Sequence, residues 1–230
     1  MKYNTNVPHF ETETGDKILY PFSPPIFQSY VDENFTNQLI LEGRKLTKDE
    51  NDWNPRLAGQ HKYGRSYHYK DDFCNKAEKY LTQYVIRFFE GLHTQFGEGY
   101  DGPRKLLQIH RSDKLNKVDT GNLKLDSLWI NFSQKHDSNP PHTHTGALSF
   151  VIYCNVPDEI FTVQTDSNTQ RAGEIIFQYG EPITELAGGE YPVRPSKNLM
   201  FIFPAKLKHF VPQYYVDAER ISVSGNYKVI

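Results

Sequence analysis

The stretch NPPHTHTGALSFVIYCNVP, residues 139–157, joins a double proline and two histidines to a long apolar run. The run from 148 to 154 is rich in apolar, β-branched and aromatic residues, which favour a buried strand. Proline and glycine lie before it, and Pro157 follows it, so both ends are marked by turn residues. The stretch therefore predicts a core strand with His142 and His144 at its entrance.

Similar short runs recur through the rest of the chain from about residue 105. Glycine, proline, asparagine and aspartate separate them, and no helical pattern lies between them. Such an arrangement indicates an antiparallel sandwich or barrel. Besides 146–157, the expected strands are KLLQIHRS (105–112), SLWINFS (127–133), EIFTVQT (159–165), GEIIFQYGE (173–181), NLMFIFPA (198–205), KHFVPQYYV (208–216) and RISVSGNYKVI (220–230).

The first hundred residues have a mixed pattern. Residues 71–97 repeat apolar side chains every three to four positions, which predicts a long helix, and Asp32 is a candidate N-cap for an earlier one. Three prolines in 18–30 predict an extended edge or loop. We expect an N-terminal mixed helical region, residues 1–104, packed on a β-rich core, residues 105–230, as one structural unit.

Composition limits the classes of partner. Lys and Arg number 26 against 28 Asp and Glu, so no field of one sign favours nucleic acid or an anionic membrane. No apolar run is long enough to span a membrane, the first residues lack the apolar part of a signal peptide, and two cysteines suggest reduced thiols. These features predict a cytoplasmic protein, but they do not predict its oligomeric state.

Three histidines form a candidate metal site. Residues i and i+2 of an extended strand point to the same face, so His142 and His144 should project together. His209 opens another β-type run, directly after FIFPAKLK. Neutral imidazole suits iron, zinc, copper and nickel, so three imidazoles converging inside a barrel would suit a divalent transition metal.

Arg220 and Ser222 are a candidate anion site on the last strand. They are also two residues apart and should share a face. A guanidinium that faces a barrel interior needs an anion, and arginine binds a carboxylate through two hydrogen bonds. An arginine at a strand start can equally reach solvent or pair with a nearby acid.

The order His-x-His, GEIIFQYGEP, NLMFIFPAKLKHFVPQ, RISVSGNY resembles the C-terminal half of the 2-oxoglutarate/Fe(II)-dependent dioxygenases, over roughly residues 125–230. It is most similar to the phage and bacterial group with His-x-His and an FPAxLxHxVxP…RISxSxN ending. The resemblance implies a double-stranded β-helix, a jelly-roll or cupin-like barrel with packed helices and an N-terminal α/β extension. It also implies Fe(II) and 2-oxoglutarate as cofactor and co-substrate, and O2 as the oxidant.

By position, the resemblance assigns His142 and His209 to the metal and Arg220 with Ser222 to the far carboxylate of 2-oxoglutarate. His144 stands where most of the superfamily has a carboxylate. It is therefore either the third ligand, which we favour, or it is displaced by a more distant acid such as Asp137. Two further residues are weaker candidates for contacts with the co-substrate: Tyr153 and Asn131. No catalytic residue is expected beyond the metal centre.

These observations favour an oxygenase that hydroxylates a C–H bond of a protein side chain, such as prolyl, or of a small molecule. Two alternatives stay open. A three-histidine cupin-like metalloenzyme without 2-oxoglutarate would explain His144 better and Arg220 worse. A non-catalytic β-sandwich, such as a binding or virion protein, would need no open metal site.

If the gene is carried by a phage, the protein would act in the host cytoplasm. The segment YGRSYHYKDD, residues 63–72, could form a lid over the barrel mouth.

Overall fold

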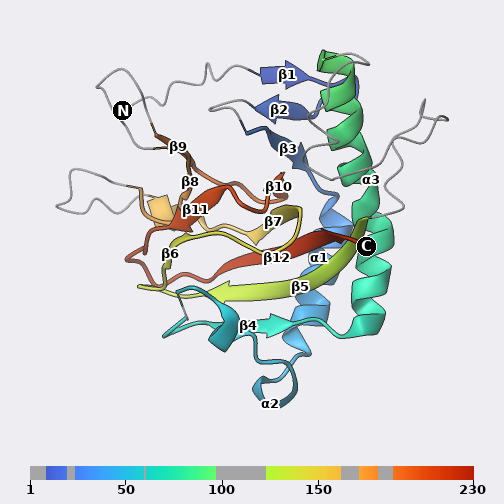
Figure 1. The fold of residues 1–230 in the computed structure, drawn as a ribbon. Coiled ribbons are helices and arrows are strands. Elements are labelled where there is room, and N and C mark those ends of the chain that lie inside the picture. The colour runs from blue at the N-terminus through green and yellow to red at the C-terminus, as the bar shows by residue number, and fades with distance from the viewer. Residues whose placement is uncertain (1–8, 20–23, 60, 97–122, 162–170, 181–188) are drawn as a thin grey trace.

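The chain folds into two antiparallel sheets, with two helices on one side of the larger sheet (Figure 1). The structure is a computed structural model, which describes residues 9–19, 24–59, 61–96, 123–161, 171–180 and 189–230. The architecture is a double-stranded β-helix with packed helices, so the predicted fold class is confirmed.

The larger sheet has eight strands, and every neighbouring pair is antiparallel. Strands from the first seventy residues lie at both of its edges. Across the sheet, the order is β1 (His9–Glu11), β2 (Lys17–Leu19), β3 (Ile26–Tyr30), β10 (Leu199–Pro204), β7 (Leu148–Asn155), β12 (Arg220–Val229), β5 (Leu123–Ser133) and β4 (Arg65–His68).

The smaller sheet has four strands and faces the larger one. Its order is β6 (Asn139–His142), β11 (Lys208–Val211), β8 (Ile175–Gln178) and β9 (Glu190–Val193). A 3-10 helix, η2 (Asp158–Phe161), follows β7. Because β6 and β11 are neighbours, the sheet pairs two segments that are more than sixty residues apart in the chain.

Two helices cover the face of the larger sheet that points away from the smaller one (Figure 1). They are α1 (Glu33–Arg44) and α3 (Asp71–Phe96), and the Asp32 side chain caps the first as predicted, accepting from the backbone N–H groups of Asn34 and Phe35. The short α2 (Lys48–Asn51) and the 3-10 helix η1 (Asn54–Arg56) precede β4. No helix in the described ranges combines the length and apolarity needed to span a bilayer.

Alternation along the strands divides the core into two layers. Ile152 in β7 and Val223 in β12 belong to the cluster under the helices. Their neighbours Val151 and Tyr153 belong to the cluster between the two sheets. The polar side chains of Arg220, Ser222, Ser224 and Asn226 line the inter-sheet cavity from every second position of β12.

Most of the strands expected from the sequence are present, namely β5, β7, β8, β10, β11 and β12. Three expectations were wrong. Residues 26–30 form an inner strand between β2 and β10 rather than an edge, residues 159–161 are helical, and 65–68 form β4 rather than part of a lid. The strand expected at 105–112 and the domain boundary at 104/105 lie outside the described residues.

The turn that leads into β4 is built around the carboxylate of Asp137, which is 4 % exposed. Its oxygens accept hydrogen bonds from the backbone N–H groups of residues 62, 63, 64 and 134 at 2.8–3.0 Å. His61 Nδ1 lies 3.2 Å from Asp137 Oδ2. Gly64 is required there, because a Cβ would lie 2.1 Å from the Phe132 carbonyl oxygen. One side chain thus fixes the loop that borders the cavity.

The environment of Asp137 makes the stability of the protein depend on pH. Burial alone would raise its pKa, but the hydrogen bonds from His61, Gln134 and Tyr63 outweigh burial and lower the pKa from 3.8 to about 2. The folded pKa is therefore below the unfolded one. The stabilisation that the Asp137 carboxylate contributes is complete at pH values above its pKa in the unfolded state. It is lost as the pH falls from there through its pKa in the folded state.

We expect Asp137→Asn to lower the free energy of unfolding by about 2 kcal/mol at pH 7, with the difference from wild type narrowing by about 1 kcal/mol at pH 3. Urea unfolding across this pH range measures both quantities. Asp126→Asn is the matched control, because Asp126 forms a part-exposed ion pair with Lys228 and should contribute little. A difference for Asp137→Asn that is constant from pH 7 to pH 3 would contradict this account.

Candidate metal centre and co-substrate pocket

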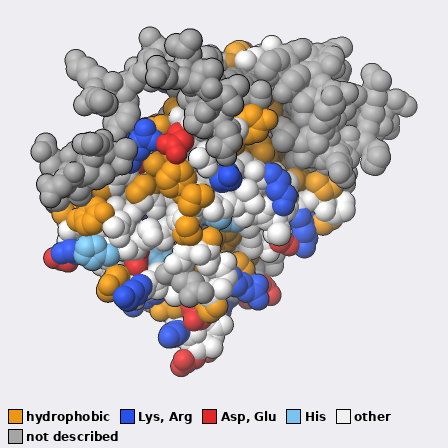
Figure 2. All heavy atoms as spheres, turned by 60° about the vertical axis from the view of Figure 1, so that its left-hand side comes forward, with side chains coloured by type: hydrophobic (Ala, Val, Ile, Leu, Met, Phe, Trp, Pro, Cys, Tyr) orange, Lys and Arg blue, Asp and Glu red, His pale blue; other side chains and the backbone are white. Residues whose placement is uncertain are grey.

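A cavity of about 890 Å³ lies between the two sheets. Its walls come from both sheets and from the segment 50–61 before β4, and its lining includes all seven candidate residues from the sequence: Asn131, His142, His144, Tyr153, His209, Arg220 and Ser222. Figure 2 shows a face of the protein on which described side chains of both charge signs are interspersed with hydrophobic ones. This surface agrees with the nearly balanced composition.

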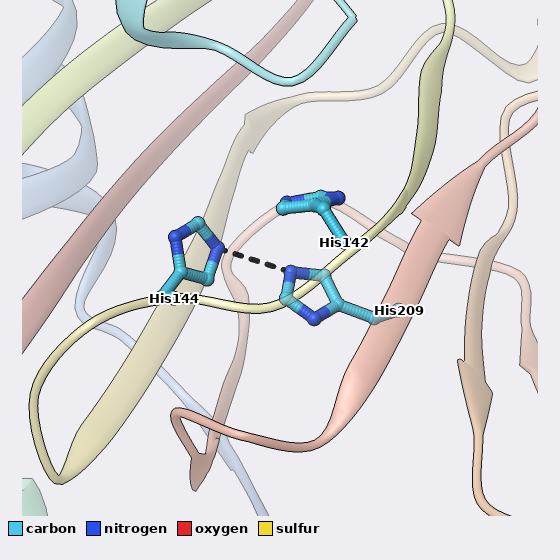
Figure 3. Close-up of side chains that lie close together, drawn as sticks. All are labelled: His142, His144 and His209. Carbon is cyan, nitrogen blue, oxygen red and sulfur yellow. Dashed lines mark hydrogen bonds between the residues drawn. The ribbon is translucent and has the colours of Figure 1, made fainter.

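His142, His144 and His209 gather at one place in this cavity (Figure 3). One ring nitrogen from each lies within 4.8 Å of the corresponding atoms of the other two. His142 and His209 are directly paired across β6 and β11, and His144 Nε2 lies 3.2 Å from His209 Nε2. In the described ranges, no carboxylate or thiol joins this group.

Two of the three rings are oriented by backbone carbonyl groups. His142 Nδ1 lies 2.7 Å from the carbonyl oxygen of Pro140, and His209 Nδ1 lies 3.0 Å from that of Leu207. A carbonyl oxygen can only accept, so in each ring Nδ1 donates and Nε2 keeps a lone pair. This is the tautomer in which Nε2 can bind a metal ion.

Burial keeps the three imidazoles neutral. It lowers the pKa of His142, and burial together with the positive charge that His142 would carry lowers the pKa of His144 to about 4. Burial, followed by the charges of His142 and His144, lowers the pKa of His209 to about 3. At neutral pH all three rings can therefore act as metal ligands.

His144 reaches the group by a route that the sequence pattern did not predict. The expectation was one extended strand carrying both His142 and His144, but β6 ends at His142. The backbone N–H of His144 instead donates to the carbonyl oxygen of Ala205 at 2.8 Å, in the turn between β10 and β11. The convergence of the two rings thus depends on a tertiary contact rather than on strand periodicity.

Arg220 lines the same cavity as a buried cation. Its side chain is 7 % exposed, and Nη1 donates to the carbonyl oxygen of Gly173 at 2.8 Å. Nε is buried without a hydrogen-bond partner, and among the described residues no ion pair joins Arg220 to a carboxylate. A buried guanidinium in this state is suited to an incoming anion.

The residues beside Arg220 add hydrogen-bonding groups. Ser222 is paired across the sheet with both Asn131 and Tyr153, so the three side chains lie in one row. The Ser66 hydroxyl donates to Asn131 Oδ1 at 2.9 Å, which leaves the Asn131 amide N–H groups to act as donors. Burial raises the pKa of Tyr153, so its phenol stays protonated.

Asp137, the carboxylate weighed as an alternative metal ligand, is occupied elsewhere. Both of its oxygens accept hydrogen bonds from the turn before β4. Moving the Asp137 carboxylate to the three histidines would break those hydrogen bonds. The geometry therefore favours His144 over Asp137 as the third member of the group.

Sequence reasoning missed one wall of the cavity. Residues 50–61 looked like a polar loop, but Trp53, Arg56 and His61 from this segment line the pocket, together with His68 from β4. Trp53 was the only signal, since a large aromatic residue in a polar stretch is a candidate binding residue.

Comparison with known proteins supports the same chemistry. Residues 127–226 match the family model described as "Putative 2OG-Fe(II) oxygenase", a region that contains every candidate site residue. No protein of curated function matches the chain significantly.

Solved structures share the fold at low sequence identity. A Pseudomonas putida prolyl-4-hydroxylase is similar with a TM-score of 0.51 and 13% identity, covering 90% of this chain and 94% of that one. HygX from Streptomyces hygroscopicus, solved with nickel and 2-oxoglutarate bound, is similar with a TM-score of 0.51 and 9% identity, covering 89% and 82%.

The site fits the cofactor and co-substrate that this family requires, since neutral imidazoles suit Fe(II) and a buried guanidinium without an ion-pair partner among the described residues suits a dicarboxylate. The family match also favours one of the three functions that the sequence left open. Residues 127–226 of the chain match the 2OG-Fe(II) oxygenases, enzymes that use O2 and 2-oxoglutarate as co-substrates.

Proposed function

We propose that this oxygenase binds Fe(II) through His142, His144 and His209, and the far carboxylate of 2-oxoglutarate through Arg220 and Ser222. We further propose that it hydroxylates a C–H bond. One observation carries the proposal: three neutral imidazoles and a buried guanidinium line the same cavity.

The histidines would hold the metal on one face and leave its other positions to exchangeable ligands. Iron held there supplies the redox chemistry by which O2 converts 2-oxoglutarate to succinate and CO2 and adds one oxygen atom to the substrate. The protein's own contribution is to fix ligand geometry and to keep the reacting groups away from bulk water. The buried side chains of Val151 and Ile175, which line the cavity, serve the second purpose.

Charge explains why Arg220 and the metal site would work together. Three neutral imidazoles leave a bound Fe(II) with its full charge of 2+, whereas a carboxylate ligand would reduce it. Arg220 adds another positive charge in the same cavity. The dianion 2-oxoglutarate would offset two of these three positive charges, with one carboxylate toward the metal and the other toward Arg220, so the co-substrate should contribute strongly to retention of the metal.

Ser222, Asn131 and Tyr153 would complete the co-substrate site. All three can donate a hydrogen bond, and Ser222, the middle member of their row, lies two residues from Arg220 on β12. Donors to a carboxylate in a dry cavity form charge-assisted hydrogen bonds, which are shorter and stronger than neutral ones.

The substrate is either a protein side chain, of which a prolyl residue is one candidate, or a small molecule. It would enter beside the segment 50–61 and β4, where Trp53 and His68 line the cavity. Membership of the phage and bacterial subgroup, the cytoplasmic location and the division at 104/105 stay predictions from the sequence. Conversion of 2-oxoglutarate to succinate by the iron-loaded protein, with and without candidate substrates, tests the proposed activity.

For the metal site, His209→Ala should weaken Fe(II) or Co(II) binding by at least about a hundredfold, because it removes a ligand. Loss of a ligand costs more affinity than loss of a residue that only orients a ligand through a hydrogen bond. His144→Ala should also weaken it, whereas His144→Asp should retain the metal through a carboxylate oxygen. Calorimetry with the metal alone measures the dissociation constants. His68→Ala is the control, since His68 lines the same cavity outside the group. Equal binding by wild type and His209→Ala would refute the site.

For the co-substrate site, Arg220→Ala should weaken 2-oxoglutarate binding by tens of fold while the metal stays bound. Losing one partner of a desolvated charge pair costs about 2–5 kcal/mol. Quenching of tryptophan fluorescence is a suitable measurement, because both tryptophans of the chain, Trp53 and Trp129, line the cavity. Arg56→Ala is the matched control: it removes an exposed arginine from the rim of the same cavity and should change the affinity by less than about threefold. Unchanged binding in Arg220→Ala would exclude this role.

A further inference from the structure

The third histidine of the group is held differently from the other two. His142 and His209 each donate from Nδ1 to a backbone carbonyl two residues earlier in the chain. In the described part of the chain, no hydrogen bond reaches Nδ1 of His144. Metal-binding histidines are normally oriented by such a bond. Something else must orient this ring.

Trp129 is the group in position to do so. Its ring centroid lies 5.7 Å from that of His144, at an interplanar angle of 48°. Of the aromatic rings that contact His144 among the described residues, the others belong to His142 and His209, which are candidate ligands themselves. Centroid distances of 4.5–7 Å are those of favourable ring contacts.

Trp129 is itself firmly placed. It lies in β5, paired with Ser224 of β12 on one side and His68 of β4 on the other, and is 4 % exposed. Trp53 stacks on it at 5.6 Å and 26°. The guanidinium carbon of Arg56 lies 4.7 Å from the centre of the Trp53 ring. A column of rings therefore runs from the rim of the cavity to His144.

The need for such support is greatest at His144. His142 and His209 are fixed by the pairing of β6 with β11, but His144 lies beyond the end of β6. A backbone hydrogen bond to Ala205 fixes its main chain and leaves its side chain free to rotate. The 3.2 Å contact between the Nε2 atoms of His144 and His209 cannot orient the ring once both atoms bind a metal, so a contact with another part of the ring must select the rotamer.

We propose that Trp129 is a positioning residue that holds the His144 imidazole in its metal-binding orientation, in place of a hydrogen bond to Nδ1. This inference rests on the proposed metal role of the three histidines. It goes beyond that role, because it assigns the orientation of one ligand to a stacked aromatic column rather than to a polar partner.

A double-mutant cycle on metal affinity tests the inference. The cycle compares wild type, Trp129→Leu, His144→Ala and the double variant. For each protein, calorimetric titration with Co(II) or Ni(II) alone gives the affinity, and the visible absorption of bound Co(II) reports on the ligand geometry. Trp129→Leu should weaken binding about tenfold, at the lower end of the range for a lost orienting partner, and Trp129→Phe by less than about threefold, because it keeps a ring. In the His144→Ala background, Trp129→Leu should cause almost no further loss.

Phe203→Leu is the matched control. Phe203 is also a buried aromatic residue against a candidate ligand, with its centroid 4.8 Å from that of His209. His209 keeps its hydrogen bond to Leu207, so this substitution should change metal affinity by less than about threefold. Circular dichroism and thermal unfolding show whether each variant folds. If the Trp129→Leu variant does not fold, Trp129→Met replaces it in the double-mutant cycle.

Two results would overturn the inference, and they are distinguishable. If Trp129→Leu weakens binding equally with and without His144, Trp129 supports the cavity in general and does not act through that ligand. If Trp129→Leu leaves the affinity unchanged while His144→Ala lowers it, His144 binds the metal without help from Trp129. If neither His144→Ala nor His209→Ala changes metal binding, the proposed metal site itself fails.

Discussion

The antiparallel pairing of β6 with β11 is the constraint on which the site depends. It places His142 directly opposite His209, although the two residues are 67 positions apart in the sequence. Each Nδ1 bonds to the backbone two residues earlier in its own segment, so the two rings are oriented locally once the pairing has brought them together. A shift of one residue in this register would turn one of the two histidines to the opposite face of the sheet.

The cavity combines two kinds of group that are rarely buried together. Burial lowers the pKa of the three histidines and keeps them uncharged. In the same cavity, Arg220 stays buried without a carboxylate partner among the described residues. The first arrangement favours a cation and the second an anion, so the cavity is complementary to a metal ion together with a dicarboxylate. This polarity is what distinguishes the cavity from an ordinary inter-sheet core.

Much of the fold could be predicted from local patterns, because a strand and a helix each impose a period on the apolar residues. The cap at Asp32, the helix at 71–96 and the strands that carry Trp129, Tyr153, His209 and Arg220 are all in their expected places. The short strands β1, β4, β6 and β9 were missed. Each has three or four residues, too few for a period to be visible, and β6 contains two prolines, which normally disfavour a strand.

The sequence by itself determined the chemistry of the site: which histidines could bind a metal, and that Arg220 and Ser222 share a face. Tertiary structure alone decided how they meet. His144 joins the group through a turn held by Ala205, Asp137 is withdrawn into the anchor of another loop, and Trp53 and Trp129 come together from segments 76 residues apart. The physical reason is that side-chain periodicity acts within one element, whereas contacts between elements depend on register, loop geometry and close packing across the whole fold.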